Sequence, residues 1–100
     1  MRAHEDGPLV SIVIPTWNGL QHLESCLPSL QAQSYRRHEI IVVDNGSSDA
    51  TLEWLAAHWP RVRVVALACN RGFAGGVNAG LAVARGSIIA LVNNDTAAEP

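Results

Sequence analysis

The amino-acid sequence predicts an α/β fold: a parallel, Rossmann-like sheet flanked by helices, in the order β-α-β-α-β-α-β. The first observation is that the apolar runs at residues 9–15, 39–44 and 87–92, and more weakly 62–67, are rich in valine and isoleucine and do not alternate with polar residues. Such runs are typical of strands buried on both faces. The second is that the segments between these runs space their apolar residues as helices do. Because crossovers between parallel strands are right-handed, these elements form one sheet with helices on each side.

The helix after the first strand is predicted from four leucines at helical spacing, Leu20, Leu23, Leu27 and Leu30. Asn18 is a plausible N-cap for this helix, since an Asn side chain can accept from the free N–H groups of the first turn. Pro28 lies inside the pattern and is expected to kink or shorten the helix, because it lacks an N–H.

The second and third helices are predicted in the same way. The apolar stripe of the second consists of Leu52, Leu55, Ala56 and Trp59. Ser48 or Asp49 is expected to cap its start, and Pro60 follows its end. The apolar stripe of the third consists of Val77, Leu81 and Ala84. Gly86 is its expected stop.

Length and composition indicate one small domain. With 100 residues, 48% of them hydrophobic and 16% charged, the chain has a globular composition. We expect a polar lead at residues 1–8 and one domain over residues 9–100. The net charge of −2 and the lack of any Lys/Arg stripe give no indication of a nucleic-acid partner. No signal peptide or membrane-length apolar run is seen, and the cysteines and histidines lack the spacing of a metal site.

Each predicted strand is followed by a polar segment, and three of these segments contain glycine. They are residues 15–19, 44–49, 69–78 and 93–96. Ligands of parallel α/β sheets bind outside the carboxyl ends of the strands, near the point where strand order reverses. Polar segments at all four carboxyl ends therefore favour a single ligand crevice.

Asp44 ends an apolar strand and has two interpretations. Its carboxylate could accept a charge-assisted hydrogen bond from an N–H of a planar base. Alternatively, it only opens an Asx turn before Asn45-Gly46, a common turn sequence.

The loop at residues 72–78 precedes the third helix. Gly75 and Gly76 would let backbone N–H groups approach an anion at the N-terminus of that helix, and Arg71 could add a charge-assisted contact. Taken alone, such glycines are more often a tight turn. They match neither the dinucleotide GxGxxG fingerprint nor a Walker loop.

The segment Asn93-Asn94-Asp95 follows the fourth strand. One carboxylate and two amides could offer oxygen ligands to Mg²⁺ or Mn²⁺, and a single protein carboxylate plus substrate phosphates is a common way to hold Mg²⁺. A polar turn is the alternative for this tripeptide taken alone.

Taken together, these residues resemble the family 2 glycosyltransferases of the GT-A fold. The matching stretches are residues 10–18, 26–30 with Gln33, 40–49, 70–80 and 91–96. They cover roughly residues 9 to 96 in the order and spacing of the family. Each stretch is moderately specific, and the ordered set is highly specific.

The resemblance implies roles in binding a nucleotide. Pro15, Thr16 and Asn18 would lie against the nucleobase and ribose, and Asp44 would accept from the N3–H of uracil or thymine. The remaining nucleotide-site residues would be Asp49, Asn70, Arg71, Gly75, Gly76, Asn78 and Asn94. Asp49 and Asn70 would border the nucleoside pocket.

The resemblance also implies a divalent metal, Mg²⁺ or Mn²⁺, at Asp95, the last position of the acidic motif of the family. That motif often carries more than one Asp, whereas here Asn93 and Asn94 precede Asp95. We therefore expect weak metal affinity until a diphosphate adds its own oxygens. The segment Asn-Asn-Asp-Thr is similar to the corresponding motif of rhamnosyltransferases and related cell-envelope polysaccharide enzymes.

The implied activity is inverting transfer of a sugar from a UDP- or dTDP-sugar to a glycan or lipid-linked acceptor. The metal would stabilise the leaving diphosphate, and a carboxylate base would deprotonate the acceptor hydroxyl. In the family that base lies well beyond the metal motif, so we expect it beyond residue 100 and expect the acceptor half to be absent. The alternative is a truncated nucleotide-binding α/β module without turnover.

Two other classes are disfavoured. A sugar-phosphate nucleotidyltransferase would need a Gly-rich, Arg-containing loop after the first strand, which residues 15–19 do not provide. A phospho-receiver domain would need a later lysine, and the sequence has none. We expect a cytoplasmic enzyme, peripheral at the inner face of the membrane when complete. Residues 87–92 would leave an unpaired apolar edge that favours self-association.

Overall fold

The computed structural model describes residues 7–32 and 37–92 and confirms the predicted α/β fold. Its elements are β1 (Val10–Thr16), α1 (Leu20–Gln31), β2 (His38–Asp44), α2 (Thr51–His58), β3 (Arg63–Ala66), α3 (Gly72–Val83) and β4 (Ile88–Leu91). The strands form one parallel sheet in the order β3-β2-β1-β4. All four predicted strands are therefore present, each within a residue or two of the expected bounds.

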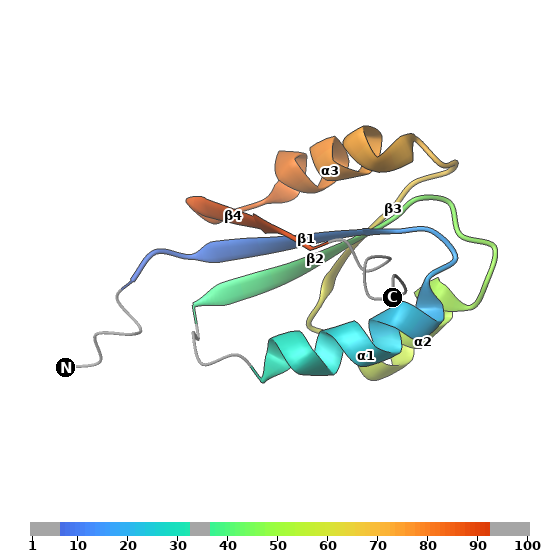
Figure 1. The fold of residues 1–100 in the computed structure, drawn as a ribbon, viewed down its shortest axis with the longest axis horizontal. Helices are drawn as coiled ribbons and strands as arrows, with labels where there is room; N and C mark the ends of the chain where they lie inside the picture. The colour runs from blue at the N-terminus through green and yellow to red at the C-terminus, as the bar shows by residue number, and fades with distance from the viewer. Residues whose placement is uncertain (1–6, 33–36, 93–100) are drawn as a thin grey trace, which may run out of the picture.

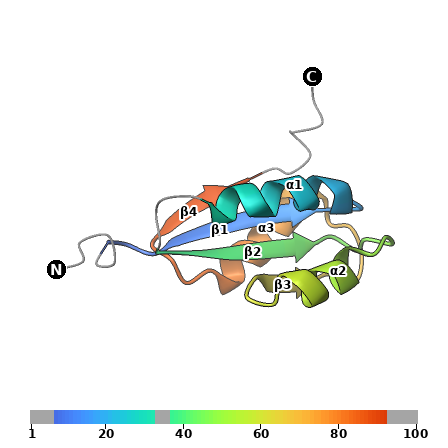
Figure 2. The ribbon, with the colours of Figure 1, turned by 90° about the horizontal axis from the view of Figure 1, so that it is seen from below.

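The sheet lies between two layers of helices, with α1 and α2 on one face and α3 on the other (Figures 1 and 2). On the first face, Ile12, Ile14, Ile40 and Val42 pack with Leu23, Leu27 and Leu55 of the helices. On the second face, Val13, Ile41 and Val43 pack against Ala79, Val83 and Ala84. Since successive strand residues point to opposite faces, β1 and β2 are buried on both, which explains their continuous apolar sequence.

Glycine allows α3 to approach the sheet closely. A Cβ atom added at Gly80 would lie 2.5 Å from Cγ1 of Val13 and 3.1 Å from Cγ2 of Val43. A larger residue at this position would therefore push the helix away from the centre of the sheet.

Two helix boundaries differ from the sequence prediction. The N-cap of α1 is Gly19, without a side-chain hydrogen bond, so the assignment of Asn18 as N-cap is wrong. Pro28 does not shorten α1, which continues to Gln31. A proline near the end of a helix removes only one donor from the last turns.

The third helix begins earlier than its apolar stripe suggests. It starts at Gly72, so the prediction of a loop over residues 72–78 is wrong, and Gly75 and Gly76 lie inside α3. The glycines had argued against a helix because of their low intrinsic propensity. Packing against the sheet outweighs that preference here, since Gly76 and Gly80 are both buried.

Strand order reverses beside β1. From β1 the chain passes outward through β2 to β3, and α3 then carries it across the other face to β4, on the opposite side of β1. Ligands of such sheets bind at the carboxyl ends of the strands flanking this reversal. β4 is an edge strand among the described residues, and its Ile88, Ile89 and Leu91 are exposed.

No helix in the described parts of the chain has the length and apolar character needed to cross a bilayer.

Candidate functional site

The carboxyl ends of the first three strands are joined by hydrogen bonds between their loops. These loops are the β1–α1 loop (residues 17–19), the β2–α2 loop (residues 45–50) and the β3–α3 loop (residues 67–71). The β2–α2 loop lies between the other two and contacts both, so its residues determine the shape of the site.

Asp44 ends β2 and is 1% exposed. The backbone N–H of Ser47 donates to its Oδ2 at 3.3 Å, and the Ser47 hydroxyl donates to its Oδ1. Asp44 therefore stabilises the turn that follows it, although the N–H that it accepts from lies three residues on and not two as in an Asx turn. Because each carboxylate oxygen has two lone pairs, these contacts leave acceptor capacity for a ligand N–H.

Asn18 connects the first two loops. Its Oδ1 accepts from the backbone N–H of Ser48 at 2.8 Å and of Asp49 at 3.2 Å. Its own backbone N–H donates to Oγ of Ser47 at 2.8 Å. The backbone of Asn18 has φ of 51°, a left-handed conformation that Asn adopts more readily than most residues. Asn18 thus links the two loops instead of capping α1.

Asn45 connects the second and third loops and is 4% exposed. Its Nδ2 donates to the carbonyl of Gly72 at 3.0 Å, and its Oδ1 accepts from the backbone N–H of Arg71 at 2.9 Å. Both ends of the buried amide are thus paired, as burial of a polar group requires. Sequence reasoning missed Asn45 as a site residue, because an Asn after Asp and before Gly reads as an ordinary turn residue.

Gly46 allows the same two loops to touch. Its φ is +80°, and a Cβ atom there would lie 2.8 Å from Cα of Cys69. Both the positive φ and the close backbone contact require glycine.

Asp49 stabilises the start of α2. Its Oδ1 accepts from the hydroxyl of Thr51 and from the backbone N–H of Thr51 at 3.1 Å, and its Oδ2 accepts from the N–H of Leu20 at 3.4 Å. Burial alone would raise the pKa of Asp49, but these hydrogen bonds outweigh it and lower the pKa below its ordinary value. The N-cap of α2 is nevertheless Ala50, without a side-chain hydrogen bond, so the prediction of Ser48 or Asp49 as N-cap is wrong. Asp49 acts from the position before the N-cap.

A hollow of about 310 Å³ opens beside this platform of loops. It is lined by Pro15, Thr16, Trp17, Asn45, Asn70, Gly72 and Phe73. Three of the predicted nucleotide-site residues, Pro15, Thr16 and Asn70, are thus brought together. Trp17 and Phe73 are half exposed and were missed by sequence reasoning. Their only signal was an aromatic residue inside a polar loop, and flat apolar walls of this kind suit a planar ligand.

Two further predicted residues lie in a neighbouring hollow. Asn18 and Asp49 line it together with Leu20, Gln21 and Glu24. Asp44 lines neither hollow and lies beneath the loops, where Ser47 covers its carboxylate.

The remaining predicted residues are not gathered in these hollows. Arg71 meets the platform through its backbone N–H, and Asn78 is exposed on α3. Gly75 and Gly76 are the fourth and fifth residues of α3, where N–H groups ordinarily pair within the helix. Gly76 instead permits close packing, since a Cβ there would lie 3.0 Å from Nδ2 of Asn45 and 3.2 Å from Cβ of Pro15. Asn94 and Asp95 lie outside the described residues.

The described residues by themselves do not form a metal site. Within residues 7–32 and 37–92, no group of three or more His, Cys, Asp or Glu side chains is placed to hold a cation. The Asp44 and Asp49 carboxylates instead accept hydrogen bonds from Ser47, Thr51 and Leu20. Any metal ligation by this chain would therefore depend on the segment that contains Asp95.

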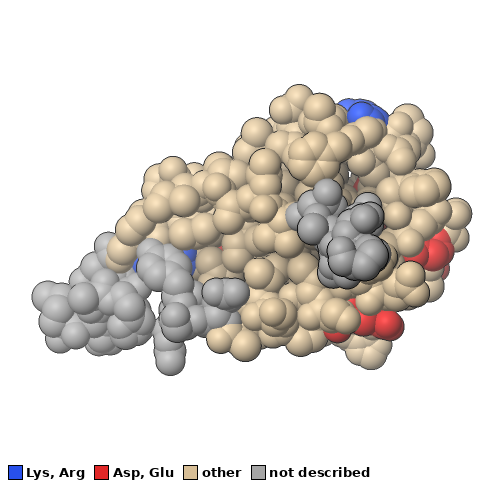
Figure 3. All heavy atoms as spheres, viewed as in Figure 1, with Lys and Arg blue, Asp and Glu red and all other residues tan. Residues whose placement is uncertain are grey.

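Acidic groups gather at the end of the molecule where the loops lie. On the face shown in Figure 3, the red atoms appear at the same end as the carboxyl ends of the strands in Figure 1. A diphosphate approaching this end would need cationic neighbours. Arg71 is the arginine that the described β3–α3 loop supplies.

The sequence matches the family model "Glycosyl transferase family 2" over residues 11–100. Among curated relatives, the succinoglycan biosynthesis protein ExoO of Rhizobium meliloti is 39% identical over 94 residues, which cover 93% of this chain and 27% of that protein. The glycosyltransferase GlyG of Streptococcus pneumoniae is 37% identical over 90 residues, covering 87% of this chain and 30% of GlyG. The chain thus spans less than a third of the length of these relatives.

Solved structures agree with these relatives. The mannosyltransferase PcManGT of Pyrobaculum calidifontis, in complex with GDP-Man and Mn²⁺, superposes with a TM-score of 0.76 at 28% identity over 88% of this chain and 28% of that chain. S. aureus TarS in complex with UDP-GlcNAc gives a TM-score of 0.79 at 28% identity over 87% of this chain and 26% of that chain. The fold is therefore of the expected GT-A type. With a family model that matches nearly the whole sequence, the chain belongs to glycosyl transferase family 2.

Proposed function

We propose that this chain binds the nucleoside diphosphate part of a sugar donor, in the hollow between the β1–α1 and β3–α3 loops. One observation carries the proposal: hydrogen bonds through Asn18 and Asn45 join three loops into one platform at the carboxyl ends of the strands. A platform fixed before ligand binding lowers the entropic cost of ordering a site around a ligand. Related proteins solved with GDP-Man, UDP-GlcNAc or UDP support the nucleotide as ligand.

The base would lie between Trp17 and Phe73, with Asp44 beneath it. The Ser47 donors hold the carboxylate of Asp44 in one orientation, with acceptor capacity remaining. An acceptor at this depth favours a base that presents an N–H, such as uracil or thymine, over cytosine, whose N3 is itself an acceptor. A ligand must reach the carboxylate past Ser47, so a small displacement of this turn on binding is part of the proposal.

We infer that the complete enzyme transfers the sugar with inversion to a glycan or lipid-linked acceptor. The name of the ExoO relative, a succinoglycan biosynthesis protein, supports polysaccharide synthesis as the setting. None of the described residues is assigned as the catalytic base. The share of the relatives that this chain covers supports a division in which residues 9–100 bind the donor, and other parts of a longer enzyme bind the acceptor and provide the base.

Asp95 is proposed as the ligand of a divalent cation, Mg²⁺ or Mn²⁺. The Mn²⁺ in the structures of PcManGT and of a mycobacterial glucosyl-3-phosphoglycerate synthase supports a metal in this family. When bound, such a cation neutralises charge on the leaving diphosphate. Asn94 belongs to the same segment, and its side-chain amide would contact the nucleotide.

Three finer assignments belong to the same proposal. The Asn-Asn-Asp-Thr segment supports a rhamnosyltransferase-like specificity. A cytoplasmic position at the inner face of the membrane follows from a lipid-linked acceptor. Self-association through β4 is supported by its exposed apolar residues Ile88, Ile89 and Leu91 at the sheet edge.

Tryptophan fluorescence tests the proposed donor site directly. The chain has three tryptophans, of which Trp17 lines the hollow while Trp54 and Trp59 pack against the core near α2. In the double variant Trp54→Phe/Trp59→Phe, the emission of Trp17 should change on titration with UDP or dTDP and remain unchanged with CDP. The titrations are run with and without Mn²⁺, because the proposed metal site should strengthen binding of the diphosphate.

The control is the same protein carrying Phe73→Ala, a half-exposed wall residue whose loss should weaken the signal without unfolding the domain. A saturable change with UDP that Phe73→Ala weakens would support the site. An unchanged Trp17 emission at millimolar UDP and dTDP, in a protein with a native circular dichroism spectrum, would contradict the proposal. Sugar transfer by the 100-residue chain alone would contradict the proposal that other parts of a longer enzyme bind the acceptor and provide the base.

A further inference from the structure

A second hollow lies at the opposite edge of the sheet, where the strands begin. Its volume is about 740 Å³, larger than the hollow at the carboxyl ends. It is formed by the starts of β2 and β3, the end of α2 and the connection from α3 to β4. The side chains that matter for its chemistry are Glu39, His58, Trp59, Arg61, Arg63 and Arg85. None of them belongs to the proposed donor site.

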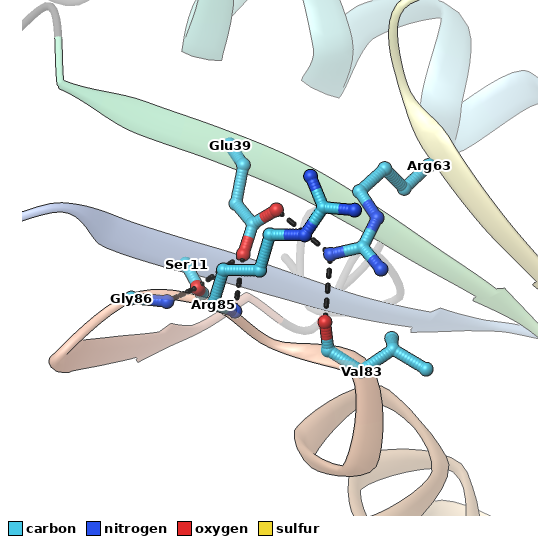
Figure 4. A network of polar contacts seen from close by, with 6 residues as sticks. All are labelled: Ser11, Glu39, Arg63, Val83, Arg85 and Gly86. Atoms are coloured by element: carbon cyan, nitrogen blue, oxygen red, sulfur yellow. Dashed lines mark hydrogen bonds and ion pairs between the residues drawn. The ribbon is translucent and has the colours of Figure 1, made fainter.

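A polar network forms the rigid floor of this hollow (Figure 4). Oε2 of Glu39 accepts from the hydroxyl of Ser11 at 2.6 Å and from the backbone N–H of Arg85 at 2.7 Å. Oε1 of Glu39 accepts from Nη1 of Arg63 at 2.9 Å, and the same Nη1 donates to the carbonyl of Val83 at 2.6 Å. The carboxylate of Glu39, on β2, thus connects β1, β3 and the segment that follows α3.

The single carboxylate does not balance the cations around it. Arg61, Arg63 and Arg85 line the hollow, and Glu39 is the only acidic residue among the described lining residues, so their summed charge is positive even with neutral histidines. Both oxygens of Glu39 are already occupied by the network. Among the described residues, no hydrogen bond or ion pair engages the guanidinium groups of Arg61 and Arg85.

The orientation of the arginines favours a shared ligand. In Figure 4 the Arg85 side chain extends across Glu39 toward Arg63, although the network holds only its backbone N–H. Arginine charges that line one hollow repel one another, and a bound anion would lower that Coulomb energy. Guanidinium groups bind phosphate through paired N–H donors, and a second group that is already fixed lowers the ordering cost.

We propose that this hollow, the amino-edge pocket, binds a phosphate-bearing anion. Arg61 and Arg85 contact the ligand directly, and Arg63, held by Glu39, contributes a fixed positive charge. The flat side of Trp59 supplies an apolar wall for the part of the ligand that carries the phosphate. The pocket is therefore a second anion site, at the far end of the sheet from the donor platform. The chain as a whole carries −2, so attraction must come from this local arrangement and not from net charge.

Calorimetric titration of the chain with inorganic pyrophosphate tests the amino-edge pocket. Ionic strength is held constant with NaCl, since screening would otherwise change with the titrant. Arg61→Ala and Arg85→Ala should each weaken binding by about tenfold, because each removes a hydrogen-bonded charge from the ligand. Neither side chain has a structural hydrogen bond among the described residues, so both variants should remain folded. Arg37→Ala is the matched control, since it removes the same charge at the same edge but lies outside the lining. It should change binding by less than about twofold.

A second experiment distinguishes the possible sources of the phosphate. It measures binding of the chain to phosphatidylcholine vesicles that contain or lack phosphatidylglycerol. Binding to the anionic vesicles that Arg61→Ala and Arg85→Ala weaken would indicate a lipid headgroup. Pyrophosphate binding without vesicle binding would indicate a soluble ligand.

Two results would overturn the proposal. One is the absence of pyrophosphate binding at millimolar concentration. The other is binding that Arg37→Ala weakens as much as Arg61→Ala and Arg85→Ala do, or that all three leave unchanged. Unchanged binding would place the anion elsewhere, for example at the donor platform, and would leave the proposed donor site standing.

Discussion

Replacing Asn45 by alanine should separate the second and third loops. The change removes a buried amide and leaves its two partners, the N–H of Arg71 and the carbonyl of Gly72, without their hydrogen bonds. Each hydrogen bond contributes about 1 kcal/mol net, and leaving partly buried partners unsatisfied adds to the cost. We expect the free energy of unfolding to fall by roughly 2–4 kcal/mol. For a domain of this size that lowers Tm by roughly 10–25 °C.

Urea denaturation followed by tryptophan fluorescence measures the effect, with two comparison variants. Asn70→Ala removes one exposed hydrogen bond, which the N–H of Gly72 donates to Oδ1 of Asn70, and should cost only about 0.5–1 kcal/mol. Asn45→Asp keeps an acceptor for Arg71 but sets a carboxylate oxygen against the carbonyl of Gly72, so it should not restore stability. If Asn45→Ala proves no more destabilising than Asn70→Ala, the view of Asn45 as the link between the loops is refuted.

Three other perturbations have outcomes that follow from single contacts. Gly80→Ala places a methyl group 2.5 Å from Cγ1 of Val13 in the core, and overpacking should reduce the free energy of unfolding by about 1–3 kcal/mol in urea denaturation. Asn18→Ala removes the acceptor of two backbone N–H groups and puts alanine at φ of 51°, a cost of about 2 kcal/mol in all, of which Asn18→Gly should recover about half; a glycine variant no better than alanine would contradict this division. Burial raises the pKa of Glu39, but the donors of its network outweigh burial, so the folded pKa lies below the ordinary value. The stability that the ionised Glu39 side chain contributes is thus present above its unfolded pKa, near 4.5. That stability is lost as pH falls through the lowered folded pKa. Urea midpoints at pH 7, 4 and 3 should fall less steeply in Glu39→Gln, and an identical pH dependence would contradict the role of the network.

The central strands were predictable because a strand buried on both faces has apolar residues at successive positions. β1 and β2 lie in the middle of the sheet, and valine and isoleucine make up four of the seven residues 9–15 and four of the six residues 39–44. The shorter β3 is an edge strand in the described sheet with partly exposed residues, and it was the weakest of the four runs in the sequence. β4 does not follow this relation, since its run was as clear in the sequence as those of β1 and β2 although three of its four residues are exposed among the described residues.

The contacts of the site were less predictable, because they depend on which loops become neighbours. Asn18 has the chemistry of an N-cap, and the sequence does not indicate that its acceptor will meet the N–H groups of residues 48 and 49, thirty positions away. Asn45 resembles any turn Asn until the β3–α3 loop is placed against it. The start of α3 was missed for a related reason, since its glycines lower helix propensity and their benefit appears only against the packed sheet.

Mutations at the two ends of β2 should act independently of each other. The donor site and the amino-edge pocket can therefore be tested separately. Glu39 and Asp44 lie five residues apart on this strand, which corresponds to roughly 16 Å at the usual rise per residue. That separation exceeds the Debye length of about 8 Å at physiological ionic strength. The partners of the two carboxylates also come from different segments: Ser11, Arg63 and Arg85 at one end, and Ser47 at the other. Glu39→Gln should therefore leave the UDP response of Trp17 unchanged while Asn45→Ala should leave pyrophosphate binding unchanged, provided that each variant is measured under conditions where it is folded. Coupling in either direction would mean that the sheet transmits a conformational change between its edges, and the loop platform would then not be fixed before ligand binding.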